Sequence, residues 1–384
     1  MSSITIIGTG LAGYNLAKEI RKLDKDVSIT MVTADDGESY SKPMLSNALS
    51  KGKSADQLIL SDAQKMQLQL NAIIHTRTVV EAIDTDHHLL KTSKGEIVFD
   101  KLVLAVGASQ RTLPIKGSGA QSILSVNDLD DYRAFQEHLL AANTVAIIGA
   151  GLIGCEFAND LLAINKKVII IGSSKTPLDR LLLPEIGEQL KERFQSQGVH
   201  WQLGVTAQSV EISNVPDHKY TITLSDGHKL DADLVFSAVG LIPNTKLAEQ
   251  AGIVVNRGIV VNKILETSVN GIYALGDCME INGLLLPYVL PIMNCARALA
   301  KTLSGEQTEI KYPAMPVVVK TPSYPIVVSP PAENVHGNWQ LEIDAHGARA
   351  LFTSSDNQLQ GFVLTDQKIS EKQSLTKQLP AVLD

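Results

Sequence analysis

The chain has few cysteines and no cysteine pair. Its three cysteines, Cys155, Cys278 and Cys295, are far apart in the sequence, so no CxxC motif is present. A small, odd number of cysteines does not support a disulfide framework of the kind that small secreted domains use. The sequence therefore excludes a disulfide-stabilised scaffold and a CxxC redox centre.

The sequence also lacks a long hydrophobic run and an excess of positive charge. Its longest apolar stretches, such as 283–293, are too short and too interrupted to span a bilayer. The first expected strand begins at Ile4, which leaves no signal peptide ahead of it. The formal net charge of -7 disfavours a general nucleic-acid binder. We expect a cytoplasmic protein without membrane insertion, nucleic-acid binding or a metal site.

What the chain does contain is enough apolar material for a large core. Of its 384 residues, 44% are hydrophobic and 20% are charged, which is typical of a globular protein. A chain of this length is too long for one ordinary domain, and it predicts two or three.

A glycine-rich turn lies near the N-terminus, between the expected strands 4–8 and 27–36. The segment between them has an apolar stripe at helical spacing, formed by Ala12, Leu16, Ile20 and Leu23. In a βαβ unit of this kind, Gly8 permits the tight turn, Gly10 lets backbone amides approach a pyrophosphate, and Gly13 lets the helix pack closely on the strand. The helix N-terminus offers unpaired N–H groups to the anion. A lone GxGxxG is weak evidence, but this context indicates a dinucleotide site.

A second copy of the same pattern begins 141 residues later. The apolar segment 144–149 precedes Gly149, Gly151 and Gly154, and an expected helix and the strand 166–172 follow. One pyrophosphate occupies one helix N-terminus. Two such units in one chain therefore predict two dinucleotide sites.

Three further segments resemble strands that end in glycine turns. The segments 101–109 and 233–244 are expected to bring backbone close to a cofactor. In 267–278, a strand delivers Gly276 and Asp277 to an expected helix start. There Asp277 either caps the helix or accepts a hydrogen bond from a sugar-like chain of hydroxyl groups.

The composition and pattern of the sequence change at about Ile310. Six prolines between 313 and 331 punctuate short apolar runs, and later segments alternate as antiparallel strands do. Residues 367–380 are expected to form a polar helical tail. The predicted fold class is α/β, with two Rossmann-like dinucleotide-binding units and a small C-terminal α+β domain.

These motifs together resemble the two-dinucleotide flavoprotein reductases of the glutathione-reductase structural type, over the whole chain. The segments that carry the resemblance are 8–13, 105–109, 149–154, 238–244 and 274–278. The stretches 34–58 and 274–292 look closer to the NADH:rubredoxin reductases of alkane-oxidising bacteria. The flavorubredoxin reductases of nitric-oxide detoxification are similar in the same places.

The resemblance implies a division of the chain into three domains. An FAD-binding domain would be split between 1–107 and 242–309. An NAD-binding domain, 108–241, would be inserted between its halves, and a C-terminal domain, 310–384, would pack near the flavin. FAD and NADH are the cofactors that this arrangement implies.

The resemblance also implies roles for particular residues. The FAD site would contain Gly8, Thr9, Gly10, Leu11, Ala12, Gly13, Thr33, Ala34, Asp35, Lys42, Val80, Glu156, Asp277, Val289 and Lys320. The NADH site would contain Gly149, Gly151, Ile153, Gly154 and Gly240. Asp35 would lie at the adenosine ribose, Val80 at the adenine, and Asp277 at the ribityl chain. Val289 and Lys320 would lie against the isoalloxazine from the side of the third domain.

The second unit departs from the dinucleotide pattern at the end of its second strand. An acidic residue there would bind the ribose 2′-hydroxyl of NAD, but the sequence is Gly172, Ser173, Ser174, Lys175. The residues alone therefore leave NADPH open, and the resemblance favours NADH.

The cysteine positions indicate where the electrons go. The stretch that would carry redox cysteines in disulfide reductases has Ser41 and Ser46 instead. Reduced flavin must then pass electrons to an external carrier. We expect Lys42 and Glu156 to act as catalytic residues, as an ion pair beside flavin N5. The ordinary alternatives are a surface lysine and an acid that interacts with the helix dipole.

The expected partner is rubredoxin, an acidic iron protein, and the resemblance implies that it feeds a terminal oxygenase such as an alkane hydroxylase. Flavorubredoxin and ferredoxin are alternative acceptors, and an NADH-binding signalling or interaction module is an alternative of another class. Basic residues suited to an acidic partner are Arg21, Lys22, Lys42, Lys51, Lys53, Arg297 and Lys301. We expect a monomer.

Overall fold

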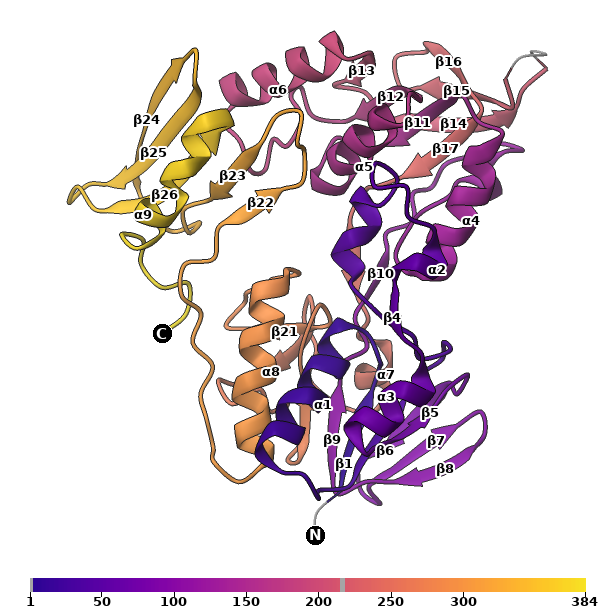
Figure 1. Cartoon of the computed structure of the whole chain (residues 1–384), viewed down its shortest axis with the longest axis vertical. Helices are drawn as coiled ribbons and strands as arrows, with labels where there is room; N and C mark the ends of the chain where they lie inside the picture. Colours follow the sequence, from indigo (N-terminus) through magenta and orange to yellow (C-terminus); the bar gives the residue numbers. More distant parts are fainter. Residues whose placement is uncertain (1–2, 215–217) are drawn as a thin grey trace.

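The computed structural model describes residues 3–214 and 218–384. Figure 1 shows three parts: a lower part with the N-terminus, an upper part in magenta, and a part in orange and yellow that carries the C-terminus. Each part is built on a sheet of its own. Within the described ranges, no helix is long and apolar enough to cross a membrane.

The first part is built on a parallel five-stranded sheet of order β20-β9-β1-β2-β5. Its strands are β1 (Ile4–Ile7), β2 (Ile29–Val32), β5 (Ile73–His75), β9 (Lys101–Leu104) and β20 (Ile272–Ala274). Strand β1 is buried throughout, as expected of a parallel sheet covered on both faces. Helices α1 (Leu11–Leu23) and α8 (Val289–Leu303) pack against each other beside this sheet.

Smaller elements surround this sheet. They are β3 (Ser39–Tyr40), α2 (Ala55–Leu58), β4 (Ile59–Ser61), α3 (Ala63–Leu70), β6 (Val80–Asp84), β7 (Leu89–Thr92), β8 (Gly95–Val98), α7 (Lys246–Gln250), β19 (Ile259–Val261) and β21 (Met279–Ile281). The short 3₁₀ helix η1 (Lys42–Asn47) leaves this part and packs on helices of the second part.

The second part contains a parallel four-stranded sheet of order β13-β12-β11-β17. Its strands are β11 (Thr144–Ile148), β12 (Lys167–Gly172), β13 (Val199–Leu203) and β17 (Leu234–Ser237). The helices are α4 (Leu129–Leu140), α5 (Leu152–Ala163) and α6 (Pro184–Ser196). An antiparallel sheet of β14 (Ala207–Ile212), β15 (Tyr220–Leu224) and β16 (Lys229–Ala232), with η2 (Ala120–Ser122), completes it.

Two short antiparallel strands carry the chain between these parts. Strand β10 (Ala108–Gln110) leads into the second part, and β18 (Leu241–Pro243) leads back. The Asn244 side chain accepts a hydrogen bond from the Ser109 hydroxyl at 2.7 Å and donates one to the Val106 carbonyl at 2.8 Å. The domain limits expected from the sequence stay a prediction.

The third part is an antiparallel sheet of order β22-β23-β26-β25-β24. Its strands are β22 (Val317–Val319), β23 (Ile326–Ser329), β24 (Gly337–Asp344), β25 (Gly347–Ser354) and β26 (Leu359–Thr365). The expected helical tail is present in two shorter pieces, η3 (Asp366–Glu371) and α9 (Lys372–Thr376). The α/β class with a small C-terminal α+β domain is confirmed.

One local expectation is wrong. No helix begins at Asp277, which lies in the turn between β20 and β21. The helix α8 begins only at Val289, because the chain first pairs β21 with β19. Asp277 is therefore not a helix cap.

Candidate active site

The first glycine turn is packed at two positions and open at one. A Cβ atom on Gly8, whose φ is +110°, would lie 2.3 Å from the Ala105 carbonyl oxygen, and one on Gly13 would lie 2.0 Å from that of Gly8. A Cβ on Gly10 would meet nothing within 4 Å. Gly8 and Gly13 are thus required by packing, whereas Gly10 leaves room for a ligand.

The start of α1 fits an anion. Gly10 caps the helix without a side-chain hydrogen bond, and the first turn contains no acid. The N–H groups of the turn around Thr9, Leu11 and Ala12 therefore have no side-chain cap, and the positive end of the helix dipole favours negative charge there. These features fit the pyrophosphate of FAD.

The second glycine turn repeats this geometry. A Cβ on Gly149, whose φ is +121°, would lie 2.4 Å from the Ala238 carbonyl oxygen, and one on Gly154 would lie 1.9 Å from that of Gly149. A Cβ on Gly151 would meet nothing within 4 Å. The neighbouring Ile153 is 37% exposed, and Gly240, at φ +99°, also faces open space. This turn fits a second dinucleotide.

Asp35 lies just past the end of β2, where a ribose is expected. Its Oδ1 accepts hydrogen bonds from the Thr33 hydroxyl at 2.6 Å, the Gly37 N–H at 2.9 Å and the Thr9 hydroxyl at 3.3 Å. In the described part of the chain, its Oδ2 makes no hydrogen bond. Asp35 and Ala34 are exposed, so the fixed carboxylate presents a free oxygen for sugar hydroxyls.

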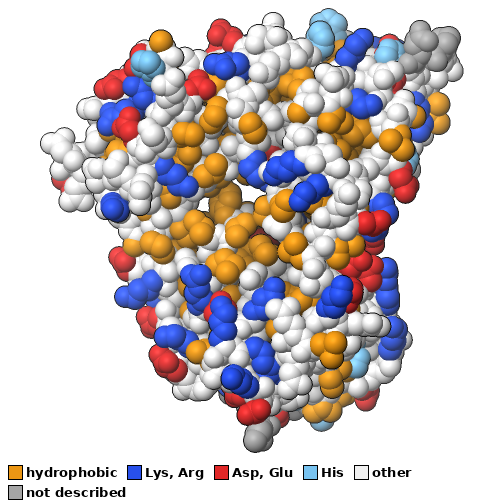
Figure 2. Space-filling view, viewed as in Figure 1, with side chains coloured by type: hydrophobic (Ala, Val, Ile, Leu, Met, Phe, Trp, Pro, Cys, Tyr) orange, Lys and Arg blue, Asp and Glu red, His pale blue; other side chains and the backbone are white. Residues whose placement is uncertain are grey.

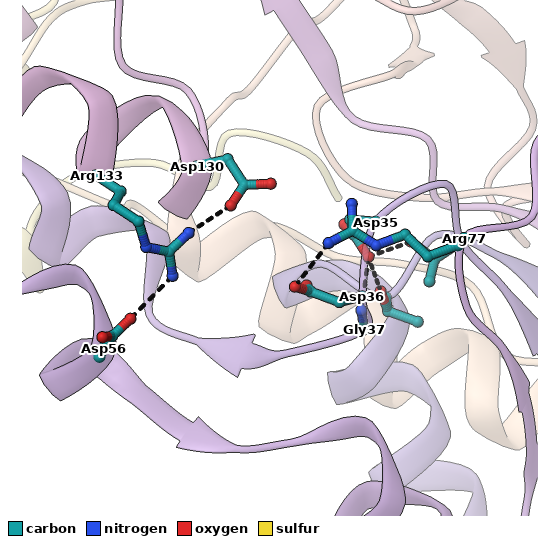
Figure 3. A network of polar contacts seen from close by, with 9 residues as sticks. Asp35, Asp36, Gly37, Asp56, Arg77, Asp130 and Arg133 are labelled. Carbon is teal, nitrogen blue, oxygen red and sulfur yellow. Dashed lines mark hydrogen bonds and ion pairs between the residues drawn. The ribbon is translucent and has the colours of Figure 1, made fainter.

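Arginines hold the acidic segments near Asp35 in place (Figure 3). Arg77 donates its N–H to the Asp35 carbonyl at 2.7 Å and its guanidinium to Asp36 at 3.1 Å. Arg133 on α4 binds Asp130 at 2.6 Å and Asp56 at 2.9 Å. Val80, at the start of β6, is half-buried.

The charges of Lys42 and Asp277 influence each other's pKa. Burial lowers the pKa of the Lys42 ammonium, and the Asp277 charge opposes that shift. Burial raises the pKa of the Asp277 carboxyl, and the Lys42 charge opposes that shift. Lys42 donates to the Asn127 side chain at 2.7 Å. Asp277 has no hydrogen bond within the described ranges, so its carboxylate fits a hydroxyl-bearing chain.

The expected ion pair between Lys42 and Glu156 is wrong. Glu156 is 1% exposed and pairs instead with Lys320 of the third part, at 2.9 Å. It also accepts the Lys320 N–H at 3.0 Å and the Ser46 hydroxyl at 2.6 Å. Lys42 turns the other way, towards Asn127 on the segment before α4. Glu156 lies in the second turn of α5 rather than the first.

Lys320 joins three parts of the molecule at this point. Its ammonium contacts Glu156 on α5, the Ser46 hydroxyl at 2.7 Å and the Pro43 carbonyl. Its side chain remains 28% exposed. The start of α8 is open as well, since Val289 is 39% exposed. The resemblance implied Lys320 and Val289 as flavin neighbours. The contacts of Ser46 and Asn127 were not predicted. Ser46 stood out in the sequence only as a serine where related reductases have a cysteine, and Asn127 belongs to no motif.

No cysteine takes part in this site. All three are fully buried and free. Burial raises the pKa of the Cys155 thiol, and it raises those of Cys278 and Cys295 to about 12. Buried thiols of this kind are unreactive.

Figure 2 shows a hollow at the centre of the molecule where hydrophobic side chains gather, with Lys and Arg side chains around it.

Comparison with known proteins agrees with this geometry. Residues 2–301 match the family model of pyridine nucleotide-disulphide oxidoreductases, and residues 309–379 match that of the rubredoxin binding C-terminal domain. The chain is 46% identical to the rubredoxin-NAD(+) reductase of Alcanivorax borkumensis over 384 residues, all of both chains. It is 47% identical to that of Acinetobacter baylyi, covering 100% of this chain and 99% of the relative.

More distant relatives and solved structures share the same architecture. The nitric oxide reductase FlRd-NAD(+) reductase of Escherichia coli is 38% identical, with 99% of each chain covered. Putidaredoxin reductase, solved in covalent complex with putidaredoxin, superposes with a TM-score of 0.89 at 25% identity, covering 99% of this chain and 94% of that one. The NADH:rubredoxin oxidoreductase of Clostridium acetobutylicum gives 0.81 at 22% identity, covering 98% and 94%. The chain belongs to the pyridine nucleotide-disulphide oxidoreductase family.

Proposed function

We propose that this protein is an FAD-dependent NADH:rubredoxin reductase. The observation that carries the proposal is the full-length identity of 46–47% with rubredoxin-NAD(+) reductases. The match of residues 309–379 to a rubredoxin binding domain supports the same acceptor. The buried, unpaired cysteines support it further, because they leave no internal sulfur to receive the electrons.

The first glycine turn would hold FAD. The amides around Gly10 would bind its pyrophosphate, the free oxygen of Asp35 would accept a hydrogen bond from a hydroxyl of the adenosine ribose, and Asp277 would accept hydrogen bonds from hydroxyls of the ribityl chain. The chemistry that a flavin held there would supply is the acceptance of two electrons as a hydride and their release one at a time. Gly151 and its neighbours would hold the NADH pyrophosphate.

Two lysines provide positive charge where the three parts meet. The Lys320 ammonium is fixed by Glu156, Ser46 and Pro43, and the Lys42 ammonium is fixed by Asn127. Fixed positive charge in a partly water-excluded site stabilises negative charge that develops during a reaction. Glu156 orients Lys320 through both its backbone N–H and its ammonium. We assign the charge-stabilising role to both lysines.

The acceptor would dock on positive charge near the flavin. The Arg21 guanidinium donates to the carbonyls of Leu70, Asp24, Val27 and Asn71, so it keeps its charge but is less available for direct hydrogen bonds to a partner. Lys22 pairs with Glu19. Lys51 and Arg297 are exposed, and no ion pair with either occurs among the described residues. We therefore expect the rate of rubredoxin reduction to fall as ionic strength rises.

The decisive experiment compares acceptors with one donor. The purified holoenzyme is mixed with NADH and with rubredoxin, a flavorubredoxin or a ferredoxin, and reduction is followed by bleaching of the iron protein. We expect turnover to be fastest with rubredoxin. Preference for flavorubredoxin would favour the second candidate, which the 38% identical relatives support. A purified protein that binds no flavin, or shows no turnover with any acceptor, contradicts the proposal.

We further infer that the protein works as a monomer in the cytoplasm, where NADH is regenerated, and that it supplies electrons to a terminal oxygenase such as an alkane hydroxylase. The resemblance to reductases of alkane-oxidising bacteria supports the last step. Size-exclusion chromatography with light scattering tests the monomer, and cell fractionation tests the location. Loss of growth on alkanes in a deletion strain tests the role.

A further inference from the structure

The two dinucleotide units end their second strands differently. The Gly8 N–H donates to the Val32 carbonyl, and the Gly149 N–H donates to that of Ile171, so these two residues occupy the same place. Three residues further on, the first unit has Asp35 and the second has Ser174. The acid that binds a ribose hydroxyl in such units is thus absent from its usual position in the second unit.

A carboxylate nevertheless reaches this position from the following loop. The Ser174 hydroxyl donates to the Asp179 carboxylate at 2.6 Å. In the first unit, the Thr33 hydroxyl donates to Asp35 at the same distance, 2.6 Å. Asp179 is exposed, and within the described ranges its Oδ1 has no hydrogen bond. In both units one carboxylate oxygen is held by a strand-end hydroxyl and the other is free.

The loop that carries Asp179 is anchored to the second glycine turn. The Leu178 N–H donates to the Ala150 carbonyl at 2.9 Å, and Leu178 is buried with a φ of +54°. Ala150 occupies the place of Thr9, whose hydroxyl contacts Asp35 in the first unit. Each unit therefore ties its carboxylate to its own glycine turn, although the tie uses different atoms.

The charges around Asp179 make the carboxylate decisive. Between Ser173 and Pro184, Asp179 is the only acid, and Lys175 and Arg180 are the only bases. Both bases are exposed, and neither forms an ion pair in the described part of the chain. Two free cations at a strand end would accommodate a 2′-phosphate. A carboxylate between them would repel that phosphate and accept the 2′-hydroxyl instead.

We propose that Asp179, positioned by Ser174, selects NADH over NADPH. This inference rests on the proposed function, because it assumes that the second unit binds the nicotinamide dinucleotide. Asp179 would take the role of the acid that is missing at position 174, five residues earlier. The cations Lys175 and Arg180 then become a latent 2′-phosphate site that opens when Asp179 is removed.

Equilibrium binding to the oxidised holoenzyme tests the assignment. Isothermal titration gives the Kd of NAD+, NADP+ and 2′-deoxy-NAD+ for the wild type and for Asp179→Ala. Because a hydrogen bond to a charged group is worth about 1.5–3 kcal/mol, we expect the variant to bind NAD+ about 10- to 150-fold more weakly. We expect it to bind NADP+ more tightly than the wild type does. Loss of the 2′-hydroxyl should weaken binding to the wild type but not to the variant.

Two further variants separate this role from a general charge effect. Asp226→Ala removes an exposed acid from the turn between β15 and β16 of the same part, and it should leave both Kd values unchanged. Ser174→Ala frees the Asp179 carboxylate and should shift the preference in the same direction by a smaller factor.

An unchanged NAD+/NADP+ ratio in Asp179→Ala, or a wild type that binds both nucleotides equally, overturns the inference. Either result leaves the proposed function standing as long as the wild type reduces rubredoxin. If the wild type binds neither nucleotide, the proposed function fails as well.

Discussion

The two glycine-turn helices, α1 and α5, begin alike and differ one turn later. Counted from the matching glycines, Asn15 on α1 corresponds to Glu156 on α5, and Glu19 corresponds to Asp160. Among residues 3–214 and 218–384, the Asn15 side chain bonds only to the Leu11 carbonyl of its own helix, and Glu19 pairs with Lys22 at the surface. Glu156 and Asp160 are each 1% exposed and bind other segments.

The buried acids make α5 a support for η1 and the residues that follow it. Asp160 accepts the N–H groups of Leu49 and Ser50 at 2.8 and 2.9 Å, at the end of η1. Glu156 accepts the Ser46 hydroxyl within η1. In the first βαβ unit the helix forms only the glycine turn expected to bind a dinucleotide. In the second unit the helix forms such a turn and also holds η1 through Glu156 and Asp160, an arrangement that we call the clamp. The clamp explains how η1, which carries Lys42, keeps its place outside its own sheet.

The largest expected effect comes from breaking the clamp. Glu156→Ala removes the carboxylate that accepts from the Lys320 ammonium and the Ser46 hydroxyl, and it leaves the partly exposed ammonium with only neutral acceptors, the Pro43 carbonyl and the Ser46 oxygen. Breaking such a pair costs about 3 kcal/mol, whereas Asn15→Ala should cost at most about 1 kcal/mol. Thermal unfolding of both holoenzyme variants measures the difference. Equal losses at the two positions would show that α5 has no special supporting role.

Alanine at the open glycines separates the two cradles by ligand. Gly10→Ala should weaken FAD binding, and Gly151→Ala should weaken NADH binding, by about tenfold each, because an added methyl group overpacks the contact by about 1–3 kcal/mol. Flavin absorbance per protein and NAD+ titration read the two sites separately. Gly10→Ala should leave the stability of the flavin-free protein unchanged, since no protein atom lies within 4 Å of the new Cβ. Flavin loss in Gly151→Ala would reverse the assignment.

The smallest expected effect concerns the cysteines, of which Cys155 occupies the position in α5 that Tyr14 occupies in α1. The Tyr14 hydroxyl donates to the Gly37 carbonyl, and the Cys155 thiol donates to the Ala150 carbonyl at 3.6 Å. If no thiol takes part in catalysis, iodoacetamide at pH 8 should modify none of the three cysteines in the folded holoenzyme and leave turnover unchanged. Mass spectrometry after denaturation should then find three reactive thiols. Modification of the native protein together with loss of turnover would contradict an electron path without sulfur.

The thiols also set a pH dependence. Folding raises their pKa above the ordinary value of about 8.5, and to about 12 for Cys278 and Cys295. The neutral thiols therefore favour the folded state fully below pH 8.5, and this contribution is lost as pH rises towards 12. Cys278→Ser should make the fall in melting temperature above pH 9 shallower than in the wild type. An identical slope would argue against this thiol as a source.

The sequence predicted the parts of the site that are local. Glycine spacing and apolar strands located both turns, because a tight turn needs Gly8 and close helix packing needs Gly13 within a few residues. Which side chains pair with each other across the fold was not predictable in this way. Glu156 pairs with Lys320, 164 residues away, because β22 and η1 both approach α5 in the folded chain. Asp277 was misplaced for the same reason, since the pairing of β21 with β19 decides where the helix starts.

The paired strands β10 and β18 have a consequence for how this chain tolerates rearrangement. Because the outgoing and returning segments are neighbours, held by Asn244, the ends of the inserted unit lie side by side. A short peptide could bridge them and close the remaining chain, while the excised unit could be expressed with its own ends free. Ser109 and Ile242 face each other across this two-stranded connection, so a crosslink between them would fasten the outgoing segment to the returning one.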